Sequence, residues 1–338
     1  MLSLANSPLR GQLFLNFYCE GKRNNMTKSL ISVCCLAYNH EQYIRQALDG
    51  ILMQKTEYPF EVVIHDDAST DRTSDIIREY EKKYPEIIKP IYQKENQHSQ
   101  GVGIFSQWVF PRAQGKYVAW LECDDYWTDP NKLQRQVSYM ENHPECSGTF
   151  HAANWLVDEK IIKNDRHSER ECDVTPQQVI CGGGEFCASA SLCFRMEYAL
   201  DRPCFRVCFP VGDYPLQILL SLRGRFHYFP QTMSCYRFGR PGSWTGSMRS
   251  DERKIQFLKK EIRAFKLLDE YTNYMYSTEI YYRITKDQSD LYAKGAIPFS
   301  EIRESFEHME WGHMKLSRMR RCYDRFLRRH LPGIKQKY

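Results

Sequence analysis

Two pairs of adjacent aspartates are the residues best placed to do chemistry. Asp66-Asp67 is followed by Ala-Ser-Thr, and Asp124-Asp125 comes just after the apolar run 117–121. Carboxylates held at a strand end can bind a hard divalent cation, which would bridge the two phosphates of a nucleotide. Two adjacent acids repel each other, which favours a ligand or a cation. The alternative is a helix-capping turn for the first pair and a solvated loop for the second, because Asp is common in both.

Three further features are candidates for the same site. Asp213 opens a helix in Val-Gly-Asp-Tyr-Pro-Leu, where it is either a general base or an N-cap. Arg237 and Arg240 flank a glycine in a turn and either clamp a diphosphate or are simply solvated. The glycine triplet 182–184 suits a close backbone approach to phosphate or sugar, but no Gly-Lys-Ser/Thr follows it, so it is not a P-loop.

The segments around the acidic pairs predict the elements that hold them. Residues 30–37, 61–65, 87–92 and 116–122 are short apolar runs typical of buried strands, and 40–54 has apolar residues at helical spacing. Strands and helices that alternate in this way predict an α/β fold, with a mostly parallel sheet flanked by helices. Ligands of such sheets bind at the carboxyl ends of the strands, where both acidic pairs lie.

The pattern changes after about residue 147. One helix is expected at 213–222 and short strands at 148–155, 189–194, 225–229 and 233–237. From residue 251 the chain is expected to be helical throughout. The predicted organisation is therefore an extension at 1–27, a catalytic domain at 28–250 and a helical region at 251–338.

The composition excludes several classes of protein. The 338 residues are 42% hydrophobic and 14% aromatic, which is enough apolar area for a packed core and argues against disorder. A net charge of +5 is too balanced to favour a nucleic-acid partner. The 13 cysteines are odd in number and form no metal-type pair, so we interpret them as reduced thiols of a cytoplasmic protein. No run approaches the roughly 20 apolar residues of a spanning helix.

The two ends of the chain differ from the rest. In the first 27 residues the apolar stretch 13–18 is too short for a signal peptide, and Lys22 and Arg23 follow it, so a disordered extension or an early start codon is expected. Residues 313–330 alternate apolar and basic side chains. This pattern favours either peripheral contact with the inner face of the membrane or a helix that packs on the domain and solvates its basic face.

Several motifs in order resemble the family 2 glycosyltransferases of the GT-A fold, bacterial type, over about residues 30–243. They are Tyr-Asn after the first strand, Asp-Asp-Ala-Ser-Thr-Asp at 66–71, Gly-Lys-Tyr-Val at 115–118, Asp-Asp-Tyr-Trp-Thr-Asp-Pro-Asn-Lys-Leu at 124–133 and Gly-Asp-Tyr-Pro-Leu at 212–216. The resemblance implies an inverting transferase that moves a sugar from a nucleotide-sugar, expected to be UDP-linked, to a glycan or lipid-linked glycan.

The resemblance also implies a role for each matching residue. Asp213 would be the catalytic base and Asp125 the ligand of Mg²⁺ or Mn²⁺, while Asp67 would contact the nucleobase and Asp124 would lie near the ribose and phosphates. The remaining nucleotide-sugar-binding residues would be Ala37, Tyr38, Asn39, Asp66, Arg237 and Arg240.

The chain departs from the family pattern at three points. Residues 101–108 lack the Arg-Asn pair of many relatives, and no His follows Tyr236-Arg237, so Arg237 or Arg240 would take over the phosphate charge. The Gln-x-x-Arg-Trp motif of processive relatives is absent, which favours single addition over polymer synthesis.

These departures keep a second hypothesis open, a degenerate transferase-like module that binds a sugar nucleotide or a partner without turnover. A nucleotidyltransferase has less support, because residues 38–41 are not the Gly-rich, basic loop expected after its first strand.

Overall fold

The structure is a computed structural model that describes residues 30–240, 248 and 250–307. The expected extension at 1–27 and the basic segment 313–330 lie outside these residues. The described chain forms two compact units, and the boundary between them passes through α5 (Pro176–Gly182). The second unit contains residues 180–183, 203–211 and those from 246 onward, and the first unit contains the remainder.

One half of the sheet in the first unit is wholly parallel, as the alternating pattern predicted. Its strands pair in the order β3 (Ile88–Tyr92), β2 (Phe60–Asp66), β1 (Ile31–Ala37) and β4 (Tyr117–Glu122). The helices α2 (Ile44–Leu52) and α3 (Thr73–Lys83) connect the first three strands in sequence. Because these strands are parallel, their carboxyl ends lie along one edge.

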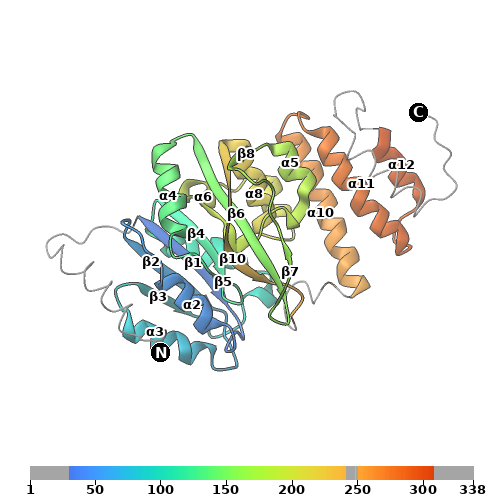
Figure 1. Ribbon diagram of the computed structural model, residues 1–338. Helices are drawn as coiled ribbons and strands as arrows, with labels where there is room; N and C mark the ends of the chain where they lie inside the picture. Colours follow the sequence, from blue (N-terminus) through green and yellow to red (C-terminus); the bar gives the residue numbers. More distant parts are fainter. Residues whose placement is uncertain (1–29, 241–247, 249, 308–338) are drawn as a thin grey trace. The chain divides into compact units, whose positions relative to one another are not determined.

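The other half of the sheet is mixed. β4 pairs antiparallel with β9 (Cys193–Arg195), and β9 pairs antiparallel with β6 (Cys146–Val157). β6 lies beside β10 (Arg225–Arg237) in a long parallel pairing that is visible in Figure 1. Three short strands complete it: β5 (Tyr126–Trp127) and β8 (Cys172–Val174) on β10, and β7 (Lys160–Asn164) on β6.

Three expectations about this half need correction. The segments 225–229 and 233–237 form one strand, β10, because register shifts after Phe229 and Thr232 absorb the residues between them. The segment 189–194 begins as a 3-10 turn, Ser189–Ser191, before β9. β7 and β8 were not expected, and β7 is exposed along its whole length, so it lacks the alternation that marks a half-buried strand.

The two faces of the parallel strands are covered differently. Alternate residues of β1, such as Val33 and Cys35, join a buried core with α2, α3 and α4 (Lys132–Asn142). On the opposite face Trp120 of β4 packs against Phe105, which belongs to the π-helical turn Phe105–Val109. The centroids of the two rings are 3.9 Å apart. The 3-10 turns His98–Gln100 and Phe110–Arg112 flank this turn, and α6 (Met196–Leu200) and α8 (Asp213–Arg223) follow later in the chain.

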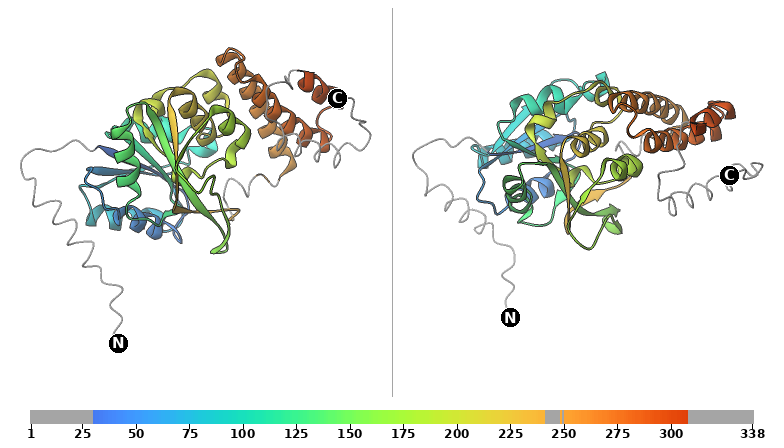
Figure 2. Two further views of the ribbon diagram at one scale, coloured as in Figure 1. Left: turned by 45° about the horizontal axis from the view of Figure 1, so that its top comes forward. Right: turned by 90° about the horizontal axis from the view of Figure 1, so that it is seen from above.

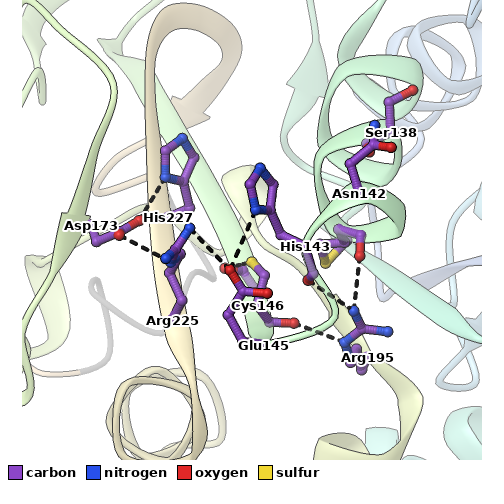
Figure 3. Close-up of polar contacts among 11 residues, drawn as sticks. Ser138, Asn142, His143, Glu145, Cys146, Asp173, Arg195, Arg225 and His227 are labelled. Carbon is purple, nitrogen blue, oxygen red and sulfur yellow. Dashed lines mark hydrogen bonds and ion pairs between the residues drawn. The ribbon is translucent and has the colours of Figure 1, made fainter.

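The amino ends of β6 and β10 are held by a polar network, shown in Figure 3. The guanidinium of Arg195 donates to the carbonyl oxygens of Met140 at 2.8 Å, His143 at 3.2 Å and Cys146 at 2.7 Å, and so closes the end of α4. Beside it Asp173 of β8 contacts His227 at 2.8 Å and Arg225 at 3.1 Å. These contacts secure the end of the mixed half that is remote from the acidic pairs.

The second unit is built mainly from α10 (Asp251–Tyr271), α11 (Ser277–Ala293) and α12 (Phe299–Glu307), which run beside one another in Figure 2. The short helix α7 (Cys204–Cys208) packs on α10. The ring centroids of Phe205 in α7 and Tyr271 in α10 are 5.0 Å apart. In neither unit do the described residues include a helix long and apolar enough to cross a membrane.

Candidate active site

The carboxyl ends of β1, β2 and β4 bring the predicted site residues to one edge of the sheet. Ala37 of β1 is the register partner of Asp66 of β2, and the backbone N–H of Asp67 donates to the Ala37 carbonyl at 3.0 Å. The N–H of Cys123 donates to the Leu36 carbonyl at 2.8 Å, which places Asp124 just beyond the same edge. Ligands of parallel sheets generally bind at this edge.

Ala37, the last residue of β1, and the two residues after it differ in their exposure and contacts. Ala37 is fully buried among the residues of the core, so only its backbone can line a pocket, whereas Tyr38 is 41% exposed. Asn39 has a φ of 53°, a conformation that Asn tolerates better than most residues. Its Oδ1 accepts the N–H of Thr70 at 2.8 Å, and its N–H donates to Ser69 at 3.0 Å. Asn39 therefore joins the ends of β1 and β2.

The first acidic pair is bound to its own surroundings. Asp66 accepts hydrogen bonds from the hydroxyls of Ser69 and Ser74. The two oxygens of Asp67 accept the backbone N–H groups of Gln97 at 2.8 Å and His98 at 3.1 Å, so this carboxylate orders the loop after β3. These contacts agree with the turn-forming interpretation, and the ligand roles of both residues stay predictions.

The second acidic pair is held by the end of β10. Asp125 is fully buried, and its Oδ1 accepts the backbone N–H of Arg237 at 2.8 Å. Its Oδ2 is buried without a hydrogen-bond partner in the described chain. Burial, and then the charge of Asp124, raise the pKa of Asp125 well above its usual range. Asp124 is itself paired, because its Oδ2 accepts a hydrogen bond from Nε of Arg240 at 2.6 Å.

The guanidinium of Arg237 is committed to protein contacts on every nitrogen. Nη1 donates to the Asp124 carbonyl, Nη2 to Gln46 at 2.6 Å, and Nε to Glu159 at 2.7 Å. The group also lies between the rings of Tyr43 and Tyr126, 4.7 and 4.8 Å from their centroids. Arg237 thus connects α2, β5 and the β6–β7 turn to the turn that carries Asp124 and Asp125, the acidic turn.

His40 belongs to this site although the sequence did not single it out. It is 6% exposed, and its Nε2 lies 2.5 Å from Nη2 of Arg240. Burial lowers the pKa of His40 to about 4. Its position directly after Asn39 was a weak signal, but its partner is 200 positions away. No local pattern reveals a contact of that kind.

Asp213 is the first residue of α8. Gly212 occupies the capping position before it. Burial raises the pKa of Asp213, which makes its carboxylate a better proton acceptor. Glu122, at the end of β4, was not among the predicted site residues. Burial and the charges of Asp124 and Asp213 raise its pKa to about 8, so Asp213 lies within electrostatic reach of the acidic turn.

The glycine triplet is divided between the two units. Gly183, with a φ of 74°, belongs to the second unit, and a Cβ placed there would lie 2.8 Å from Nη1 of Arg283. Its lack of a side chain is therefore explained by contact with Arg283 of α11 rather than by a ligand.

Comparison with known proteins gives both a family and a fold. The profile described as Glycosyl transferase family 2 matches residues 32–199. An uncharacterized protein of Mycobacterium tuberculosis is 35% identical over 234 residues, which cover 67% of this chain and 63% of that protein. The chain thus spans less than two thirds of the length of this relative. TuaG of Bacillus subtilis, whose name assigns it as a glycosyltransferase to teichuronic acid biosynthesis, is 39% identical over 123 residues, 36% of this chain and 46% of TuaG.

Among solved structures, residues 1–349 of Staphylococcus aureus TarS in complex with UDP-GlcNAc superpose with a TM-score of 0.57. The match covers 78% of this chain and 72% of that one at 19% identity, so it bears on the fold alone. Together with the motifs at the strand ends and the parallel half-sheet that carries them, these matches show that the chain belongs to glycosyl transferase family 2 and has a GT-A-type fold.

Proposed function

We propose that the chain transfers a sugar from a nucleotide-sugar to the hydroxyl of a glycan or lipid-linked glycan, with inversion at the anomeric carbon. The observation that supports this most directly is the set of carboxylates around the end of β4. Asp124 and Asp125 form the acidic turn, and the charges of Asp124 and Asp213 both raise the pKa of Glu122. This shared effect supports a proton acceptor near a diphosphate-binding turn.

In the proposed reaction Asp213 is the base. The acceptor hydroxyl gives its proton to the Asp213 carboxylate as its oxygen forms a bond to the anomeric carbon. The bond from that carbon to the diphosphate oxygen breaks, and the nucleoside diphosphate leaves with the bonding electrons. Attack opposite the leaving group inverts the configuration in one displacement. A positioned base of this kind contributes about 10²–10⁴-fold to the rate.

The residues present fit a divalent cation at one position. The buried Oδ2 of Asp125 has no hydrogen-bond partner in the described chain, and a carboxylate oxygen suits Mg²⁺ or Mn²⁺. Within residues 30–240 and 250–307 no group of three or more His, Cys, Asp and Glu could hold a metal. We therefore assign Asp125 as the protein ligand, with the diphosphate and water supplying the rest. Bound there, the cation would offset the charge of the departing diphosphate.

For the donor we propose a UDP-linked sugar, which the complex of TarS with UDP-GlcNAc supports by analogy of fold. The nucleotide would lie against Ala37, Tyr38 and Asn39, with Asp67 at the base and Asp124 near the ribose. For the acceptor, the assignment of TuaG to teichuronic acid biosynthesis supports a cell-envelope glycan.

The proposed location is the cytoplasm, with peripheral contact at the inner face of the membrane. All eleven cysteines in the described part of the chain are unpaired thiols, which suits a reducing compartment. The membrane contact rests on the basic segment 313–330, which lies outside the described residues.

The test combines binding with turnover. Calorimetry with UDP, GDP, CDP and their sugars, with and without Mn²⁺, should show one preferred nucleotide for the wild type and weaker Mn²⁺-dependent binding for Asp125→Ala. Asp213→Asn should bind the same nucleotide with unchanged affinity and lose about 10²-fold or more in transfer rate.

The same experiment separates the transferase from the degenerate binding module. A module would bind a nucleotide-sugar but release no nucleoside diphosphate in either wild type or Asp213→Asn. Failure of every diphosphate nucleotide to bind the wild type would refute the donor assignment.

A further inference from the structure

Asp124 already has a cationic partner within the chain. Its Oδ2 lies 2.6 Å from Nε of Arg240, and the two side chains are only 11% and 14% exposed. The guanidinium also lies over the ring of Tyr43, 5.4 Å from its centroid. A pair this well shielded from water is screened little by salt, and the position of its charge is well defined.

The contact between Arg240 and His40 determines the state of the histidine. A guanidinium can only donate hydrogen bonds, so the Nε2 of His40 that faces Nη2 of Arg240 at 2.5 Å must be the acceptor. The imidazole is therefore neutral, and its proton is on Nδ1. His40 adds no positive charge to the site and, together with Asp124, orients the guanidinium.

His40 also has a hydrogen-bond donor that no described residue accepts. Nδ1 is buried and has no partner among the described residues. Leaving a buried donor unsatisfied is costly, and an oxygen of a bound ligand would satisfy it. A cation and an unused donor thus lie together beside the acidic turn.

Arg237 is a useful contrast because it lies three residues away and has a different role. Its nitrogens are all bonded to Gln46, Glu159 and the Asp124 carbonyl, and its backbone N–H binds Asp125. Arg237 shapes the acidic turn, whereas the contacts of Arg240 include the side chains of Asp124 and His40.

We propose that Arg240, oriented by Asp124 and His40, supplies a built-in positive charge for the donor diphosphate and sustains nucleotide binding without a divalent cation. The inference rests on the proposed function and specifies how its donor is held. Since Asp124 is engaged by Arg240, the acidic turn retains only Asp125 for a metal, and part of the charge balance passes to the guanidinium. A metal would then add to turnover more than to binding.

The experiment is calorimetric titration of UDP and GDP into the full chain in excess EDTA and, separately, in Mn²⁺. We expect the wild type to bind one of them in EDTA, with an affinity that falls as NaCl is raised. Arg240→Gln should weaken binding in EDTA about tenfold or more, the loss typical of one charge-assisted hydrogen bond. In Mn²⁺ the same substitution should have a smaller effect.

Matched variants distinguish the effect of the Arg240 charge on binding from a loss of folded structure. Arg240→Lys keeps the charge and should retain most of the binding in EDTA. Arg45→Gln removes an equal charge from the exposed pair with Glu79 on the neighbouring helix α2 and should leave Kd unchanged. His40→Gln retains an acceptor for Arg240 and should bind more tightly than His40→Phe. Thermal unfolding of each variant checks that the fold is intact.

Two results would overturn the inference and leave the proposed function standing. One is loss of all wild-type binding in EDTA while Mn²⁺-dependent binding persists. The other is equal Kd for wild type and Arg240→Gln in EDTA. If neither nucleotide binds under either condition, the donor assignment fails, and this inference fails with it.

Discussion

Lys132 is a buried amine that the proposed reaction does not use. It is fully buried at the start of α4, where its Nζ donates to Gln136 at 2.7 Å and lies over the ring of Trp127, 4.2 Å from its centroid. No carboxylate in the described chain forms an ion pair with it. Burial lowers the pKa of Lys132 to about 8, from about 10.5 for an exposed lysine.

This shift predicts a pH-dependent stability. Between about pH 8 and 10.5 the unfolded chain holds a proton on Lys132 that the folded chain has lost, so this group stabilises the fold increasingly as pH rises. The total effect is about 3 kcal/mol. In Lys132→Met this contribution disappears. The stability advantage of the variant over wild type should therefore be greatest below pH 8 and shrink towards pH 10.5.

Urea denaturation of both proteins from pH 7 to 10.5 measures this difference. Other titrating groups affect both proteins alike, except Cys193 and His151, because the charge of Lys132 lowers their pKa values. Parallel stability curves across the range would show that the buried amine keeps its ordinary pKa.

The residues of the site were predictable to different degrees. Asp124, Asp125 and Asp213 follow from local sequence, because strand ends and helix starts are readable within a few positions. The partners of these residues are not readable in this way. His40 meets Arg240, and Glu159 meets Arg237, only after β1, β6 and β10 have assembled. The sequence also could not show that Asp67 binds the loop after β3, about 30 positions away.

At the scale of elements, Arg195 secures the carboxyl end of α4. The last carbonyls of a helix lack partners within it, and here one guanidinium donates to Met140, His143 and Cys146. Hydrogen bonds to a charged group contribute more than neutral ones, about 1.5–3 kcal/mol each. Arg195 therefore connects a helix, the strand β6 and its own strand β9.

We expect Arg195→Leu to lower the free energy of unfolding by about 2–4 kcal/mol, because it leaves several carbonyls unsatisfied. Arg223→Leu is the control, since Arg223 pairs with Asp201 near the surface with side chains 43% and 33% exposed. That loss should stay below about 1 kcal/mol. Equal losses in chemical denaturation would mean that the carbonyl contacts of Arg195 add little.

The elements that a local sequence pattern defines were predicted well. Those that depend on pairing with a distant strand were predicted poorly. The parallel half-sheet followed from the alternation of apolar runs and helical patterns. β10 was predicted as two strands because Pro230-Gln231 interrupts its apolar pattern, and only the pairing with β6 carries the strand across them. β7 has no buried face and is defined solely by its hydrogen bonds to β6.

At the scale of the whole molecule, the second unit is built from segments that are separated in the sequence. Its helices α10 and α11 follow residue 250, but α7 comes from within the range expected to form the catalytic domain. Phe205 is fully buried and Phe209 is 6% exposed, and their ring partners are Tyr271 and Phe265 of α10.

A chain of residues 28–250 should therefore fold poorly by itself. Removing α10 uncovers Phe205 and Phe209, and each uncovered aromatic side chain costs about 1.5–3 kcal/mol. We expect this truncation to aggregate in size-exclusion chromatography, whereas residues 28–338 should elute as a defined species. Replacing both phenylalanines by serine should improve the solubility of the truncated chain. A truncation that is monodisperse and unfolds cooperatively would contradict this expectation.

The register shifts of β10 also determine which of its side chains face the acidic turn. Between Phe229 and Ser234 the strand advances five positions while β6 advances two, from His151 to Ala153. Side chains alternate along a strand, so a slip of one residue with this surplus unchanged reverses every residue beyond it. Deleting Gln231 alone would bring Phe238 to the place of Arg237. An aromatic ring would then face Asp124, and nucleotide binding would be lost although no site residue had been substituted.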